Sequence, residues 1–339
     1  MAEAGAEQAA RGDSSAVRGG HRRARWLRVL GSVVALAAIG LCVRELTDSW
    51  PSVRAELRHA RLGWLGPALA CAAAFVLVLA LQWWRWLLAF GIRTNPVDAT
   101  AWYLGGELGK YLPGSVWTVL GRGELARRGG IARGASYSST LLAYGTMCVA
   151  AAMVCGVAGP AMALAGGPEW GWLFLPLLVL APAAVHPSAL RPALAAARRV
   201  TGGRLDAPTP RLTALVSLVG WCTPAWVLLG VASLSFTRLL SLDASPSRII
   251  LAAVAAWTVG FLAVPVPAGA GVRELVFVAL CGLPTASGAA VALLSRSSLL
   301  LVDAALGATA LIVAGRRAPR RASAPTAAAV SESTPGLLP

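Results

Sequence analysis

The sequence has few charged residues for its length. Only 13% of its 339 residues are Asp, Glu, Lys or Arg, while 57% are apolar; soluble domains are about a quarter charged and about half apolar. Mean hydropathy is +0.66, and apolar runs of about 20 residues, the length that crosses a bilayer as a helix, recur along the chain. The shortage of charge excludes an ordinary soluble protein and predicts an all-α polytopic membrane protein.

Residue types that build metal sites and catalytic centres are also scarce. The chain has six cysteines and three histidines. The cysteines lie in or beside apolar runs without C-x-x-C spacing, as small buried hydrophobic residues do, and the histidines are isolated. We therefore expect no metal site, no cofactor and no enzymatic activity.

Acidic residues are half as numerous as basic ones, which leaves a formal net charge of +15. The arginines occur in tails and loops beside apolar runs, where basic residues orient membrane helices and contact anionic lipid. The alternation of aromatic and basic residues that is typical of nucleic-acid binding is missing. The expected partner is therefore a membrane lipid with an anionic head group, and no nucleic acid.

Six apolar segments are long enough to cross a membrane as single helices. They are residues 28–44, 63–89, 134–158, 170–187, 211–236 and 285–314. The polar ends of the chain, 1–25 and 317–339, are expected to be disordered tails, and no cleavable signal peptide is expected before the first span. The predicted transmembrane domain is residues 26–316.

Two further apolar stretches are interrupted near their middle. Residues 96–128 break at Leu112-Pro113-Gly114, and residues 248–282 break at VPVPAGAG, residues 264–271. A break leaves backbone N–H and C=O groups without partners, which is tolerated at membrane depth only where protein or a water-filled cavity covers them. Each stretch is therefore predicted to form a re-entrant helical hairpin. A loop between two short tilted spans is the alternative.

The positions of the arginines favour the re-entrant interpretation. The N-terminal tail is basic and should be cytoplasmic. Two crossings return the chain to the cytoplasm near Arg93. A hairpin that enters and leaves on the same side then keeps the next basic cluster inside (Arg122, Arg127, Arg128 and Arg133). The same counting places both termini in the cytoplasm, here the cytoplasmic side of a bacterial plasma membrane, and residues 159–170 outside.

This topology divides the domain into halves, about 26–165 and 166–316. Each half has two spans, one broken hairpin and one span, and the odd number of crossings turns the second half upside down, as in the inverted repeats of many transporters. Both breaks precede a basic residue, an acidic residue and a leucine, in LPGSVWTVLGRGEL (112–125) and VPAGAGVREL (266–275). The spacings differ, so this similarity alone does not establish a repeat.

Charged residues gather around the two breaks. Helices that begin there present free N–H groups and positive dipole ends, which suit an anion such as a lipid phosphate. A charge inside the membrane costs at least about 2.5 kcal/mol, so it is usually paired or functional. The candidate lipid- or anion-binding residues are Glu107, Lys110, Pro113, Gly114, Arg122, Gly269, Gly271, Arg273, Glu274, Arg296 and Asp303.

Some of these residues have a structural alternative. Arg296 and Asp303 are seven residues apart, on one helix face, where a buried pair would fix the helix register. Arg122 would be solvated, together with Glu124, at a cytoplasmic edge. Lys110, the only lysine in the chain, could pair with the glutamate three residues earlier.

The two broken regions resemble the signature regions of a known family. GELGKYLPGSVWTVLGRGELARRGG (106–130) and VPVPAGAGVREL (264–275) are similar to the lysylphosphatidylglycerol synthase transmembrane-region family, also called flippase-like or UPF0104, and the resemblance covers about 25–315. It implies an integral membrane protein akin to the domain that flips aminoacylated phospholipid. The motif positions that it carries over are Lys110, Tyr111, Pro113, Gly114, Arg122, Pro267, Gly269, Gly271 and Glu274. Members that aminoacylate lipid have a soluble acyltransferase domain after the membrane region. This chain ends about 25 residues after its last predicted span, so synthase activity is not expected.

The sequence thus predicts a non-enzymatic lipid translocase, which moves an anionic phospholipid or a polyprenyl-phosphate-linked lipid between leaflets. The alternative is a membrane subunit that presents lipid to a separate glycosyltransferase or lipid synthase. Translocation predicts a polar cavity that reaches both leaflets, whereas the accessory role predicts a large apolar patch on one face. An intramembrane enzyme is the least favoured reading.

Overall fold

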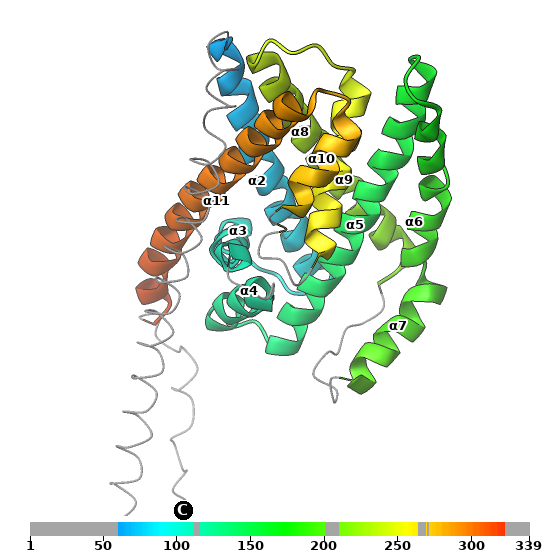
Figure 1. Cartoon of the computed structure of the whole chain (residues 1–339). Coiled ribbons are helices and arrows are strands. Elements are labelled where there is room, and N and C mark those ends of the chain that lie inside the picture. The colour runs from blue at the N-terminus through cyan, green and yellow to red at the C-terminus, as the bar shows by residue number, and fades with distance from the viewer. Residues whose placement is uncertain (1–59, 112–115, 201–209, 264–268, 270, 323–339) are drawn as a thin grey trace, which may run out of the picture.

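The computed structural model describes residues 60–111, 116–200, 210–263, 269 and 271–322 (Figure 1). Within these residues the regular structure is helical, without a β-strand. The predicted first span, 28–44, lies outside them, as do the centre of the first break, most of the second break, and all or most of the two predicted tails. The predicted all-helical class is confirmed for the described part of the chain.

Four helices are long and apolar enough to cross a membrane. They are α2 (Leu65–Ala89) with a preceding 3-10 turn (Leu62–Trp64), α5 (Arg133–Leu164), α8 (Leu212–Leu239) and α11 (Thr285–Ala322). A fifth candidate combines a 3-10 segment (Glu169–Phe174), α6 (Leu177–Val185) and α7 (Pro187–Val200), with a bend of 54° before α7. The protein is therefore a multi-pass membrane protein with four or five candidate spans among the described residues, and the count of six stays a prediction.

Each interrupted stretch forms two short helices that pack against each other. The first contains α3 (Pro96–Glu107), a 3-10 turn (Leu108–Tyr111) and α4 (Val116–Arg128); the second contains α9 (Pro246–Leu262) and α10 (Val272–Cys281). The helices stop on either side of the predicted breaks. Helices of 12 and 10 residues, such as α3 and α10, are too short to cross about 30 Å of hydrocarbon at 1.5 Å per residue. The re-entrant path of each hairpin stays a prediction.

The helices that precede the two hairpins end in the same way. α2 is closed by Gly91 with a φ of 76°, and α8 by Ser241 with a φ of 59°. After each, an N–H donates to a carbonyl five residues earlier at 3.0 Å, from Ile92 to Leu87 and from Leu242 to Thr237. This bond is the one that characterises a Schellman closure.

The hairpins also begin in the same way. Asn95-Pro96 opens α3 and Ser245-Pro246 opens α9, with proline in the first turn, where its missing N–H costs nothing. Every residue of the second junction stands 150 positions after its counterpart in the first, as Ser245 does after Asn95. The sequence comparison missed this register because it compared only the breaks, where the spacing differs.

The packing of the two halves corresponds around a central pair, α2 and α8. α2 packs on α3 as α8 packs on α9, and α4 packs on α5 as α10 packs on α11. Across the halves, α3 packs on α11 as α9 packs on α5. Figure 1 shows the hairpin α3–α4 in the lower part of the view and the hairpin α9–α10 in the upper part. The helices therefore form two structurally corresponding groups, and each group packs its hairpin against a long helix of the other.

Two sequence-based boundaries were wrong. Residues 187–200, expected as a loop, form α7, in which Leu190 and Leu194 pack against the core while Arg198 and Arg199 are exposed. α11 continues to Ala322, past the predicted start of the C-terminal tail at 317. Both errors have one cause: arginine-rich composition suggested loops and tails, but arginine is a good helix former.

A chain of aromatic rings joins the helices around the centre of the molecule. Phe75 of α2 contacts Trp226 of α8 at 5.8 Å, Trp226 contacts Trp257 of α9 at 5.1 Å, and Phe261 contacts Tyr144 of α5 at 5.0 Å, all between ring centroids. Tilted and edge-to-face pairs of this kind stabilise beyond the area they bury. Phe75, Tyr144, Trp257 and Phe261 line the cavity described next.

Candidate functional site

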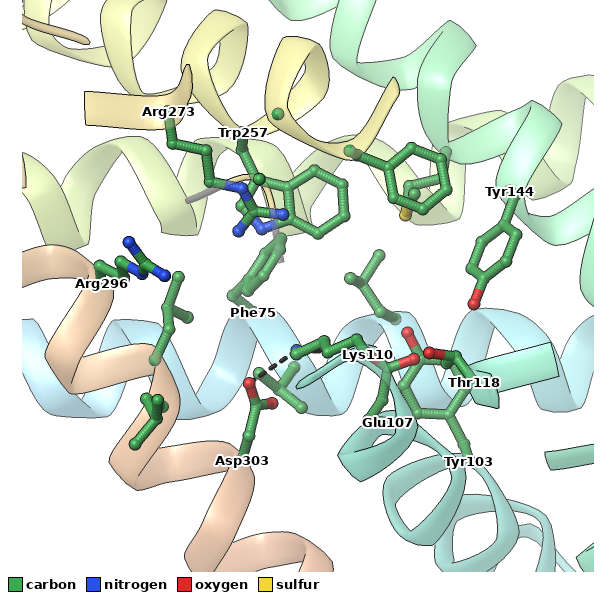
Figure 2. Close-up of a pocket in the computed structure, with 18 residues that line it drawn as sticks. Phe75, Tyr103, Glu107, Lys110, Thr118, Tyr144, Trp257, Arg273, Arg296 and Asp303 are labelled. Atoms are coloured by element: carbon green, nitrogen blue, oxygen red, sulfur yellow. Dashed lines mark hydrogen bonds and ion pairs between the residues drawn. The ribbon is translucent and has the colours of Figure 1, made fainter. Parts of the chain in front are cut away.

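A cavity lies between the two hairpins and is bounded by α2, α3, α4, α5, α9, α10 and α11 (Figure 2). Its volume is about 80 Å³, room for a few water molecules at most. The apolar part of the lining comes mainly from the aromatic rings described above and from α2. The charged part consists of Glu107, Lys110, Arg273, Arg296 and Asp303.

Lys110 joins the first hairpin to α11. Its Nζ lies 2.6 Å from Oδ2 of Asp303 and 3.2 Å from Oε2 of Glu107. The side chain of Asp303 is 1% exposed and that of Lys110 is 25% exposed, so the carboxylate is sealed and the ammonium faces the cavity. Figure 2 shows the Lys110 side chain reaching across to Asp303 from the α3 side. The ion pair spans two helices that are far apart in the sequence.

Arg122 of α4 is completely buried behind the same cavity. Its Nη2 donates to Oε1 of Glu107, and its guanidinium carbon lies 3.9 Å from the ring centroid of Tyr103 and 5.4 Å from that of Tyr144. Gly106 of α3 makes this position possible, because a Cβ there would lie 2.7–2.8 Å from backbone and Cβ atoms of Arg122. α3 and α4 are therefore in close backbone contact at the buried ion pair.

Arg273 of α10 holds the related position in the second hairpin, but it lines the cavity. Its guanidinium carbon lies 4.7 Å from the ring centroid of Trp257, and its side chain fills the space where a Cβ at Gly260 of α9 would stand. Arg296 of α11 donates from Nη1 to Oε1 of Glu274, on α10, at 2.8 Å. The second hairpin is thus also joined to α11 by an ion pair.

The sequence between residues 26 and 307 matches the family described as the lysylphosphatidylglycerol synthase TM region. The chain belongs to this family. A comparison with curated proteins gave no match. Membership confirms the resemblance seen in the two broken regions, and it identifies a membrane protein of a family connected with lipid-related processes.

In this member of the lysylphosphatidylglycerol synthase TM family, many of the predicted site residues come together. Those that line the cavity are Glu107, Lys110, Gly269, Arg273, Arg296 and Asp303. Glu274 and Arg122 adjoin it through their ion pairs, and Gly271 is the exposed residue before α10, with a φ of 78°. Tyr111 ends a 3-10 turn, but its side chain, Pro113 and Gly114 lie outside the described residues.

Arg296 and Asp303, the two residues considered as a pair from their spacing, each form an ion pair with another element. Two residues seven positions apart are separated by about 10 Å along a helix, and each instead reaches a nearer partner on another element, Glu274 and Lys110 respectively. The prediction of a solvated edge agrees with Glu124, whose side chain is 36% exposed and accepts hydrogen bonds from Arg127 at 2.8 Å. It was wrong for Arg122, which points the other way, into the core.

The sequence analysis missed the aromatic residues that enclose the charges, Tyr103, Tyr144 and Trp257. Their only signal was spacing: Tyr103 stands one helical turn before Glu107 on α3. As to other ligands, the described part of this family member contains no group of three or more His, Cys, Asp or Glu residues that could hold a metal ion. The arrangement of the cavity suits the electrostatic binding of an anion.

Proposed function

We propose that this protein moves an anionic lipid between the leaflets of the membrane and binds its phosphate in the cavity between the two hairpins. The charge of the cavity carries the proposal. Three cations line it, Lys110, Arg273 and Arg296, against two carboxylates, which leaves one positive charge in excess. Because unbalanced charge is costly at membrane depth, a phosphate diester with one negative charge fits the lining.

The two corresponding halves support transport over static binding. If the second half is inverted relative to the first, as the predicted topology requires, the cavity lies at the interface of an inverted repeat. That is where transporters of this architecture bind their substrates and alternate their access. Ligand cavities of about 300–1,000 Å³ are usual, so a cavity of about 80 Å³ corresponds to a closed conformation. A head group would enter after α11 and the first hairpin separate at Lys110 and Asp303.

The direct test is reconstitution into liposomes with fluorescent phosphatidylglycerol. A membrane-impermeant quencher should bleach only the outer-leaflet lipid of protein-free vesicles. When the protein is present, lipid from the inner leaflet should also be bleached, because the protein moves it to the outer leaflet. Phosphatidylglycerol should move several-fold faster than phosphatidylcholine, whose head group carries no net charge. Bound lipid without movement would instead support the accessory role, in which the protein presents lipid to a separate glycosyltransferase or lipid synthase.

The proposed orientation places both termini in the cytoplasm of a bacterial cell and residues 159–170 outside. Arg128 is the exposed last residue of α4, just before the start of α5, and Ala165 is the exposed residue after the end of α5. Each can be replaced by cysteine in a chain whose six cysteines have been changed to serine. Ala165→Cys is expected to react with a membrane-impermeant maleimide on intact cells, and Arg128→Cys only after permeabilisation. Labelling of Arg128→Cys from outside intact cells would contradict the prediction that the first hairpin is re-entrant.

A further inference from the structure

We infer that Arg122 and Arg273 are the phosphate-binding arginines of two corresponding half-sites, of which only the one at Arg273 faces the cavity in this closed conformation. The inference rests on the proposed function and specifies it, because it says how a lipid phosphate changes sides. Each half-site is defined as one arginine with the aromatic ring beneath it: Arg122 with Tyr103, and Arg273 with Trp257.

Three features make the half-sites equivalent. Each arginine lies on the second helix of its hairpin and precedes a Glu-Leu pair, directly in the second hairpin and after one glycine in the first. Each guanidinium packs over a ring from the first helix of the same hairpin, at 3.9 Å in the first and 4.7 Å in the second. Each arginine also occupies the space left by a glycine of that first helix, Gly106 or Gly260. The preceding junctions repeat at 150 residues, whereas the rings and the glycines of the half-sites repeat at 154, a difference of about one helical turn.

The two arginines differ in what surrounds them. Arg273 lines the cavity, whereas Arg122 is 0% exposed and is not part of the lining. Two nitrogens of Arg122, Nε and Nη1, have no hydrogen-bond partner within the described residues. A buried donor without an acceptor costs about 1–3 kcal/mol, more for a charged group. The first half-site therefore holds donor capacity that an oxyanion would satisfy.

Two tyrosines separate Arg122 from the cavity. Tyr103 and Tyr144 both line the cavity and both contact the guanidinium. Lys110 lies next to Glu107. Figure 2 shows the Lys110 side chain in the middle of the cavity, with Tyr103 and Tyr144 on one side of it and Arg273 on the other. In a second conformation of the protein, the first half-site would be open to the cavity and the second half-site would be closed off from it. The phosphate would then pass from Arg273 to Arg122 beside Lys110.

The test separates binding from transport with Arg273→Gln and Arg122→Gln. Binding of fluorescent phosphatidylglycerol is measured in detergent micelles, and its movement in liposomes. Arg273→Gln is expected to weaken binding at least about tenfold and to abolish movement, whereas Arg122→Gln should leave binding within about twofold and slow movement at least about tenfold. Arg128→Gln is the matched control, since Arg128 lies on the same helix with its side chain 69% exposed, and it should change neither.

A purely structural role of Arg122 makes a different prediction. If the arginine only balances Glu107, the double variant Glu107→Gln/Arg122→Gln, which removes both charges of the buried pair, should restore folding and movement together. The half-site role predicts a thermally stable double variant that still fails to move lipid. Recovery of movement would overturn the inference, and so would an Arg122→Gln variant that folds normally but loses binding as completely as Arg273→Gln. A wild-type protein that neither binds nor moves lipid would reject the proposed function itself.

Discussion

Replacing Lys110 by alanine is expected to abolish lipid movement. The side chain is the cation of the first hairpin that faces the cavity, and without it the lining changes from one positive charge in excess to none. The same substitution leaves Asp303 sealed from solvent without its 2.6 Å partner. Removing one member of a buried pair costs about 3–5 kcal/mol, so Lys110→Ala should also lower the melting temperature in detergent.

The double variant Lys110→Met/Asp303→Asn separates the two effects. It removes both charges and keeps side chains of similar size, so it should regain most of the thermal stability lost by Lys110→Ala. If Lys110 contacts the lipid phosphate, this stable variant should still fail in the liposome assay. Recovery of lipid movement would show that Lys110 only neutralises Asp303.

Lys110→Arg provides a graded version of the same test. The charge and the pair with Asp303 should survive, while the planar guanidinium changes the geometry of donation. Partial movement with a normal melting temperature is the expected result. Wild-type rates would show that only the charge at this position matters.

Replacing Gly106 by alanine is expected to destabilise the protein strongly. The added Cβ would lie 2.8 Å from the backbone N and Cα of Arg122, closer than real Cβ atoms approach, and backbone atoms cannot rotate away. α3 and α4 would have to separate and stretch the buried pair between Glu107 and Arg122. Overpacking typically costs about 1–3 kcal/mol, and the strained ion pair adds to this.

Gly145→Ala in α5 is the matched control. A Cβ at this exposed helical position meets no atom within 4 Å, and alanine is favoured over glycine in a helix by about 1 kcal/mol. Thermal unfolding in detergent should therefore show a lower melting temperature for Gly106→Ala and an equal or higher one for Gly145→Ala. Equal melting temperatures for the two variants would contradict the close approach of α3 and α4.

The sequence by itself determined the features that depend on neighbouring residues. The apolar lengths of 63–89 and 211–236 predicted α2 and α8 closely, because the cost of exposing polar backbone to hydrocarbon is decided locally. The interruptions at Pro113-Gly114 and at 264–271 predicted where the hairpin helices stop, since proline and glycine act on their own turn of backbone. The motifs in these two breaks were also sufficient to indicate the family.

Only the tertiary structure decided which charges meet. Lys110 and Asp303 are 193 positions apart in the sequence, and their pairing depends on how α3 packs on α11. Arg296 and Asp303 had the right spacing for one helix face but found partners on other elements. Arg122 and Glu124 are two residues apart on α4 and therefore point in different directions, one into an aromatic enclosure and the other toward solvent. In each case a side chain bonds to the group nearest in space, and that distance is set by helix packing rather than by helix periodicity.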